Sequence, residues 1–207
     1  MAPPDDADEP GAEVIYGVHP VTELLESRAQ DVERVFVVRG RHAKLGRLLR
    51  AARERGIPVS HLEKEVLVRK VTAVLGKDLT GSRLAVWGLA FKPETDDMRE
   101  AAAIRIVEGL LAAGASVAVH DPVAMDVARE WHFGDRVDYA ADAYKACTDA
   151  DALLIVTEWL QYRRPDWPAV ASELKTPVVF DGRNLFSPER MRDYGFTYYP
   201  IGRKQAT

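Results

Sequence analysis

Residues 84–100 read LAVWGLAFKPETDDMRE, and this stretch decides the fold class. It opens with the apolar run Leu84 to Trp87, then passes through Gly88 into a polar turn. Two further runs, LLIV at 153–156 and PVVF at 177–180, are also apolar throughout. Strands without alternating polar residues are typical of a parallel sheet that is covered by helices on both faces.

Outward from this stretch, strand and helix patterns alternate from about residue 64 to residue 207. A helix from about Glu63 to Leu75 precedes them and ends at Gly76. The pattern predicts an α/β fold, a Rossmann-like parallel sheet with helices on both faces, preceded by a small α/β domain. The expected strands are 84–87, 116–120, 152–156, 177–180 and 197–199. The expected helices are 99–113, 123–131, 141–148, 167–174 and 188–194.

The first part of the chain divides into a tail and a small domain. Residues 1–13 are rich in proline and acids and are predicted to be a disordered acidic tail. Residues 14–63 carry a short α/β pattern, with His19 and Pro20 as the turn that enters its first helix. The expected elements are extended chain at 14–16, a helix at 21–28, a strand at 34–38, a helix at 45–55 and a strand at 57–61.

Composition excludes several classes of protein. The chain has 207 residues, 47% of them hydrophobic, which suffices for one large or two small domains. The net charge of −4 argues against bulk polyanion binding. The single cysteine, Cys147, forms no internal disulfide, and CxxC metal spacing is absent from the sequence. With an acidic N-terminus and no membrane-length apolar run, a cytoplasmic location and no membrane contact are expected.

In an open parallel sheet, ligands bind beyond the carboxyl ends of the strands. Fixed cations follow two of the expected strands here: Lys92 and Arg99 follow the first, and Arg183 lies in DGRN. They could converge on a diphosphate, although solvated loop cations would show the same spacing. Asp96 and Asp97 are expected to cap the helix that begins near Met98.

The turn GLAFKP lacks the GxGxxG that lets a dinucleotide approach the backbone, so NAD is not expected to bind this domain alone.

The runs LAVWGLAFKPETDDMRE, VHDP, ADALLIVTEW and VVFDGRNLF occur in this order, and together they resemble the C-terminal domain of UDP-glucose dehydrogenases. The resemblance covers about residues 66–203. It implies that Phe91 and Lys92 contact a UDP-sugar and that Arg183 binds it, with Asn184 as a weaker candidate. It also implies that Arg99 reaches toward an NAD held by another domain. Ala102 stands where the family commonly has proline.

The family reaction is the NAD-dependent oxidation of UDP-glucose to UDP-glucuronate, which proceeds through a reactive cysteine. The resemblance covers neither the NAD-binding domain nor the catalytic cysteine domain of that enzyme. Cys147 lies on an expected helix before a buried strand and is interpreted as a small apolar thiol. His120 is interpreted as a hydrogen-bonding or packing residue and not as a base. No catalytic residue is therefore assigned, and NAD is expected only where a partner supplies the missing domain.

The stretch YGVHPVTELL and the RVFVVRGR strand and turn are similar to the substrate-binding domain of SpoU-type RNA 2′-O-ribose methyltransferases. Seven basic residues and the single acid Glu54 lie between residues 39 and 55, giving a local charge near +6. Such a face could contact RNA phosphates through Arg47, Arg50 and Arg53, or form the solvated side of an amphipathic helix. The basic residues are Arg39, Arg41, Lys44, Arg47, Arg50, Arg53 and Arg55.

Three hypotheses follow from the sequence. The first is a UDP-sugar-binding domain that is inactive alone or active with a partner. The second is an RNA-binding module without methyl-transfer activity. The third is a fusion of two unrelated segments in which both sites have decayed.

Overall fold

The computed structural model describes residues 15, 17–38, 45–62 and 66–201. The predicted tail, the start of the helix expected at Glu63, and Arg39, Arg41 and Lys44 lie outside the described residues. The chain divides into two compact units, Met1–Lys64 and Glu65–Thr207. In the described part of the chain, no helix is long and apolar enough to cross a membrane.

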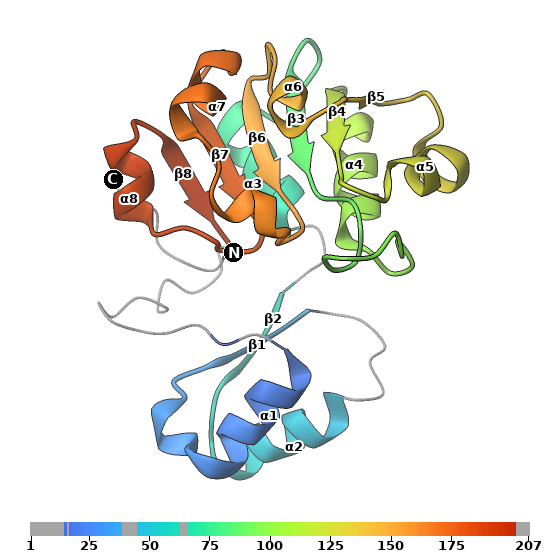
Figure 1. The fold of residues 1–207 in the computed structure, drawn as a ribbon. Helices are drawn as coiled ribbons and strands as arrows, with labels where there is room; N and C mark the ends of the chain where they lie inside the picture. Colours follow the sequence, from blue (N-terminus) through green and yellow to red (C-terminus); the bar gives the residue numbers. More distant parts are fainter. Residues whose placement is uncertain (1–14, 16, 39–44, 63–65, 202–207) are drawn as a thin grey trace. The chain divides into compact units, whose positions relative to one another are not determined.

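The first unit pairs two helices with two parallel strands (Figure 1). Strands β1 (Val35–Val38) and β2 (Val59–Leu62) run in register from Val35 opposite Val59. Helix α1 (Val18–Ser27), the 3-10 turn η1 (Ala29–Asp31) and helix α2 (Leu45–Glu54) complete the unit. Its small core is built from Leu25, Val35, Val37, Leu48, Ala51, Ala52 and Ile57.

Helix α1 begins at Val18, three residues earlier than the sequence predicted. Proline fits the first turn of a helix because the N–H that it lacks has no partner there. His19 and Pro20 therefore belong to the first helical turn and are not a turn before the helix. Gly17, with φ of 102°, takes the backbone conformation that precedes the helix.

The second unit is a six-stranded, fully parallel sheet. Its strand order is β5-β4-β3-β6-β7-β8, the doubly wound order of a Rossmann fold. The predicted Rossmann-like fold class is therefore confirmed. The strands are β3 (Arg83–Trp87), β4 (Ser116–His120), β5 (Asp138–Tyr139), β6 (Ala152–Ile155), β7 (Val178–Asp181) and β8 (Thr197–Pro200).

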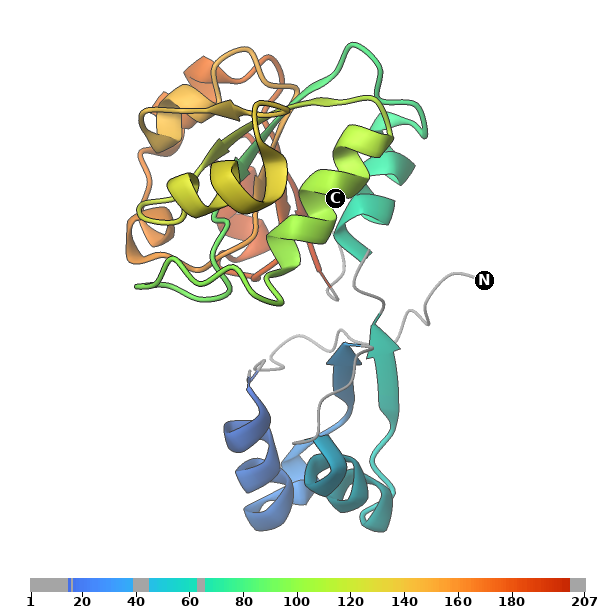
Figure 2. The ribbon, with the colours of Figure 1, turned by 90° about the vertical axis from the view of Figure 1, so that its right-hand side faces the viewer.

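Helices cover both faces of this sheet (Figures 1 and 2). Side chains of a strand alternate between faces, so Leu84 and Val86 pack with α3, α4 and α5, whereas Ala85 and Trp87 pack with α6, α7 and α8. The helices are α3 (Val66–Leu75), α4 (Ala102–Ala112), α5 (Met125–Ala128), α6 (Ala143–Ala146), α7 (Trp167–Glu173) and α8 (Pro188–Asp193), with the short turns η2 (Arg129–Phe133) and η3 (Leu160–Arg163).

The order of the strands reverses between β3 and β6, and the chain segments after these two strands touch there. Gly88 has φ of 95°, and a Cβ atom on it would lie 2.5 Å from Cβ of Thr157 and 2.6 Å from its backbone nitrogen. The Thr157 hydroxyl donates to the Ala90 carbonyl at 2.7 Å. Glycine is therefore required at 88 by both conformation and space.

Gly88→Ala should destabilise the second unit by about 3 kcal/mol, because it combines a left-handed backbone with a clash against Thr157. Gly81→Ala is the matched control, since Gly81 has φ of 83° but open space around it. Its free energy of unfolding should fall by only about 1 kcal/mol. Urea denaturation followed by tryptophan fluorescence measures both. Equal losses in the two variants would contradict the close contact.

Candidate functional site

The carboxyl edge of the second sheet gathers the charged loops that the sequence singled out. Because the strands are parallel, the segments after β3, β6 and β7 emerge at this same edge. Phe91 and Lys92 follow β3, Glu158 follows β6 and Arg183 follows β7. Phe91 has 56% of its surface exposed, and its backbone N–H donates to the Asp97 carbonyl at 2.9 Å.

A buried carboxylate ties the loops after β3, β4 and β6 together. Asp121, just after β4, has no exposed surface. One of its oxygens, Oδ1, accepts from the loop that follows β4, and the other accepts from the loops that follow β3 and β6. The donors are the backbone N–H groups of Leu89, Ala90, Val123 and Ala124 and the indole Nε1 of Trp159, at 2.7 to 3.1 Å.

Arg183 is held at the edge by Glu158. Its Nε lies 2.6 Å from Oε2 of Glu158, and the two side chains are 40% and 24% exposed. The N–H direction does not meet the geometry of a hydrogen bond, so the contact is an ion pair. The Arg183 backbone N–H donates to Oδ1 of Asp181 at 2.8 Å. Burial raises the pKa of Asp181, and hydrogen bonds from Tyr198 and the backbone oppose that rise.

Asn184 joins the loop after β7 to the end of β8. Its Nδ2 donates to the Ile201 carbonyl at 2.7 Å, and its Oδ1 accepts from the Ile201 N–H at 2.9 Å. Its φ of 52° is a left-handed conformation that asparagine tolerates well. The amide thus has a structural role at the edge, and its contact with a UDP-sugar stays a prediction.

Arg99 is bound by Asp97 instead of standing free. Its Nε and Nη2 donate to the two carboxylate oxygens of Asp97 at 2.9 and 2.8 Å. This pair lowers the pKa of Asp97 to about 2, chiefly through the hydrogen bond from the guanidinium.

The prediction that Asp96 and Asp97 cap the following helix was wrong. Helix α4 begins only at Ala102, and its N-cap residue is Ala101, whose side chain accepts no hydrogen bond from the helix N–H groups. Asp97 caps a local turn, since its Oδ1 accepts from the backbone N–H of Arg99 at 2.9 Å.

Residues 85–188 match the profile described as the UDP-glucose/GDP-mannose dehydrogenase family, UDP binding domain. The chain belongs to the UDP-glucose/GDP-mannose dehydrogenase family. It is 43% identical to a UDP-glucose 6-dehydrogenase of Rhizobium meliloti over 72% of this chain, and 42% identical to one of Pseudomonas aeruginosa over 70%. The matched region is 34% and 33% of those relatives, so the chain spans about a third of their length.

The solved structures agree with this assignment. A UDP-glucose dehydrogenase from Pyrobaculum islandicum is similar with a TM-score of 0.58 and 31% identity, covering 78% of this chain and 33% of that one. Residues 14–74 separately match the profile described as RNA 2′-O ribose methyltransferase substrate binding. Both resemblances seen in the sequence are therefore confirmed.

The UDP-binding domain offers no reactive thiol in its described part. Cys147 is fully buried, as expected, and burial raises its pKa to about 12. His120 is also buried, with Nδ1 2.8 Å from the Tyr162 hydroxyl, and desolvation lowers its pKa. Among the described residues, no group of three or more His, Cys, Asp or Glu side chains is placed to hold a metal ion.

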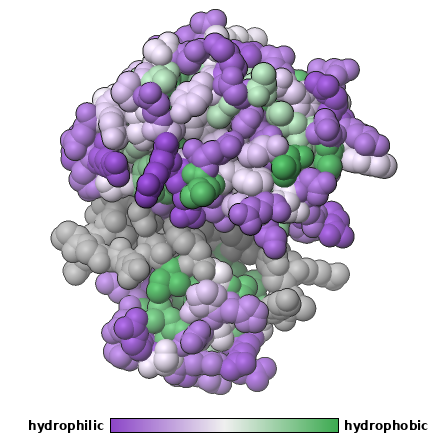
Figure 3. Space-filling view, in the orientation of Figure 1, coloured by the Kyte–Doolittle hydropathy of each residue, from purple (hydrophilic) through white to green (hydrophobic). Residues whose placement is uncertain are grey.

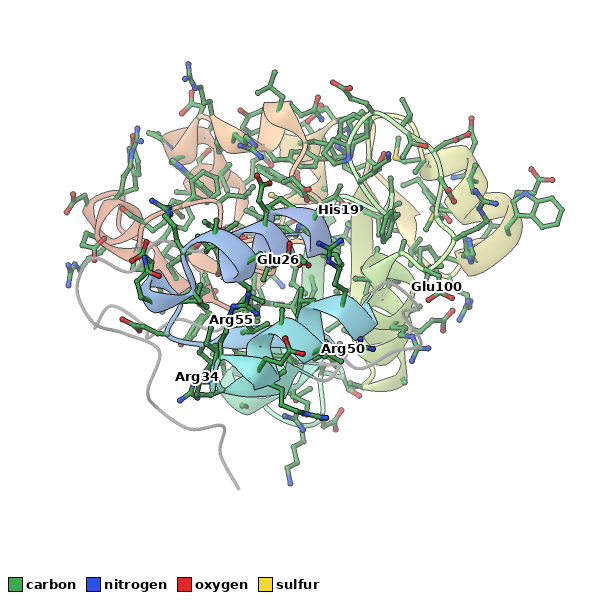
Figure 4. The ribbon with its side chains drawn as sticks, turned by 90° about the horizontal axis from the view of Figure 1, so that it is seen from below. His19, Glu26, Arg34, Arg50, Arg55 and Glu100 are labelled. Atoms are coloured by element: carbon green, nitrogen blue, oxygen red, sulfur yellow. The ribbon has the colours of Figure 1, made fainter. Side chains whose placement is uncertain are left out.

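In the unit that resembles the RNA methyltransferase domain, one predicted RNA-contacting arginine is already paired. Arg47 donates from Nε and Nη2 to the carboxylate of Glu26 at 2.8 and 2.9 Å. Figure 4 shows Arg50 on α2 and Glu26 on the neighbouring α1. Arg50 and Arg53 remain on the surface of α2.

Two residues of the UDP-binding domain were not assigned a role from the sequence. Asp121 follows β4 directly and Glu158 lies three residues after β6, in HDP and TEW, which were recognised as segments of the edge. Their position after strands could have marked them as candidate site residues. Only the structure shows which groups their carboxylates contact.

Asp121→Asn should destabilise the UDP-binding domain by about 3 kcal/mol, because an amide NH2 would replace an oxygen that accepts from buried donors. The exposed Asp126→Asn on α5 is the matched control and should change stability by less than about 0.5 kcal/mol. Thermal and urea unfolding measure both. A loss at Asp121 as small as at Asp126 would refute the role of this carboxylate.

Proposed function

We propose that the second unit binds UDP-sugars at the carboxyl edge of its sheet, with Lys92 and Arg183 on the diphosphate and Phe91 against the ligand. The observation that carries this proposal is that the backbone N–H groups of the turn after β3 are already hydrogen-bonded within the protein. In a dinucleotide-binding fold, backbone N–H groups of this turn face the pyrophosphate. Here Asp121 accepts from the Leu89 and Ala90 N–H groups, so an anion at this edge depends on side-chain cations.

Exposed apolar side chains beside these cations suit a ligand with both charged and uncharged parts. Phe91 and Leu160 are 56% and 78% exposed in the segments after β3 and β6. Most of the surface visible in Figure 3 is hydrophilic and interrupted by small apolar areas. A nucleotide diphosphate sugar combines an aromatic base with two phosphates, and such ligands are held by apolar walls and a few charged groups.

The chain by itself binds the sugar nucleotide without oxidising it. A thiol with a pKa of about 12 is almost entirely protonated at neutral pH, so Cys147 does not act as the nucleophile of the family reaction. Oxidation of UDP-glucose to UDP-glucuronate requires a partner that supplies the NAD domain and the reactive cysteine. Arg99, which is 90% exposed, would then reach toward that NAD.

A second candidate function rests on the match of residues 14–74 to an RNA-substrate-binding domain. In this alternative, the first unit contacts RNA phosphates through α2 without catalysing methyl transfer. Because Glu26 already neutralises Arg47, the contact would depend on Arg50 and Arg53.

Titration calorimetry with UDP and UDP-glucose tests the first proposal. Arg183→Ala and Lys92→Ala should each weaken UDP binding at least tenfold, about 1.4 kcal/mol, because each removes a cation from the diphosphate. The exposed Arg190→Ala on α8 and Lys77→Ala before β3 are matched controls that should bind as wild type does. No UDP binding by the wild type, or equal losses in the controls, would reject the proposed site.

RNA binding tests the alternative. Charge reversal by Arg50→Glu and Arg53→Glu should abolish a salt-dependent affinity for a single-stranded RNA, measured by fluorescence anisotropy. The double variant Lys77→Glu and Arg190→Glu in the second unit is the control of equal charge change. Affinity that is absent, independent of salt or unchanged in the double variant counts against an RNA-binding module.

A further inference from the structure

Glu158 stands on a segment whose neighbours are fixed on both sides. Thr157 before it donates its hydroxyl to the Ala90 carbonyl at 2.7 Å, and Trp159 after it donates its indole N–H to Asp121 at 3.0 Å. Thr157 and Trp159 are 1% and 8% exposed. The backbone of Glu158 is therefore held rigidly between two buried anchors at the carboxyl edge.

The carboxylate of Glu158 is balanced by Arg183. Its Oε2 is buried and accepts no hydrogen bond from the described residues, while Nε of Arg183 lies 2.6 Å away. An uncompensated buried carboxylate is strongly unfavourable, so the ion pair with Arg183 offsets the desolvation of Oε2. If Arg183 left this position for a ligand, the buried oxygen would lose that compensation.

The closest approach of the pair is through Nε, at the base of the guanidinium. The two terminal Nη groups can form a fork that matches two phosphate oxygens, as can Nε together with one Nη. A carboxylate placed beside Nε thus restricts where the guanidinium lies and does not occupy its two Nη groups. Arginine loses side-chain freedom when it binds a ligand, and fixing it beforehand lowers that entropic loss.

We propose that Glu158 is a positioning residue that orients Arg183 for the diphosphate of the UDP-sugar, an inference that rests on the proposed UDP site. Glu158 carries the same charge as the ligand and could instead compete for Arg183. The buried position of Oε2 favours the positioning role. If Glu158 competed with the ligand, binding would take Arg183 away and leave the charge on the buried Oε2 without compensation.

Calorimetry with UDP on the full chain distinguishes these roles. Glu158→Ala should weaken UDP binding about tenfold, and Glu158→Gln, which keeps an oxygen able to face Nε, should weaken it less. In an Arg183→Ala background, neither Glu158 substitution should weaken UDP binding any further, because Glu158 acts through Arg183. Glu189→Gln on α8, which removes an exposed charge, should leave UDP affinity unchanged.

Tighter UDP binding by Glu158→Gln would overturn the inference and make Glu158 a competitor. A Glu158 substitution that weakens UDP binding equally in the wild-type and Arg183→Ala backgrounds would overturn the inference in favour of a purely structural role. So would a loss of UDP affinity that only parallels a fall in the unfolding temperature. If Arg183→Ala weakens UDP binding but the Glu158 variants do not, this inference alone fails. If Arg183→Ala has no effect, the proposed UDP site fails as well.

Discussion

The arrangement of the UDP-binding domain depends on the buried carboxylate of Asp121. It accepts hydrogen bonds from segments that follow three different strands, so the loops after β3, β4 and β6 are fixed relative to one another. A buried charge is tolerated only where donors surround it, and five N–H groups do so here. The same bonds occupy the backbone N–H groups of Leu89 and Ala90 at the turn after β3. Asp121 therefore builds the edge and occupies N–H groups that could otherwise bind an anion.

The two arginines that the family resemblance assigns to ligands are each held by a carboxylate. Asp97 binds Arg99 through both oxygens, and Glu158 pairs with Arg183. The two ion pairs differ in their exposure to water, and therefore in strength. The Arg99 side chain is 90% exposed, so its pair is screened by water and easily exchanged for another partner. Oε2 of Glu158 is buried, so the pair with Arg183 is the more persistent of the two.

The sequence predicted the second sheet well because its strands are apolar throughout and its helices follow a clear pattern. It missed β5, since the two residues Asp138 and Tyr139 are too short a strand to carry a pattern. The candidate site residues were predicted from the family motif and from their place after strands. The partners of those residues were not predictable, because a hydrogen bond such as that from Trp159 to Asp121 spans 38 positions and leaves no periodic trace. The error at Asp97 has the same origin, since an acid before a helix can serve a turn as well as a cap.

The doubly wound strand order is shared by domains that bind dinucleotides, yet the local chemistry at the reversal point separates this domain from them. Gly88 packs against the backbone of Thr157, and the N–H groups of Leu89 and Ala90 face a carboxylate. A pyrophosphate placed at this turn would meet the negative charge of Asp121 instead of free donors. In the proposed function, topology places the ligand at this edge, while one buried aspartate leaves the phosphates to side chains instead of the backbone. In the proposed site that role falls to Lys92, on a loop that Asp121 helps to position, and to Arg183, on a loop held by Asp181.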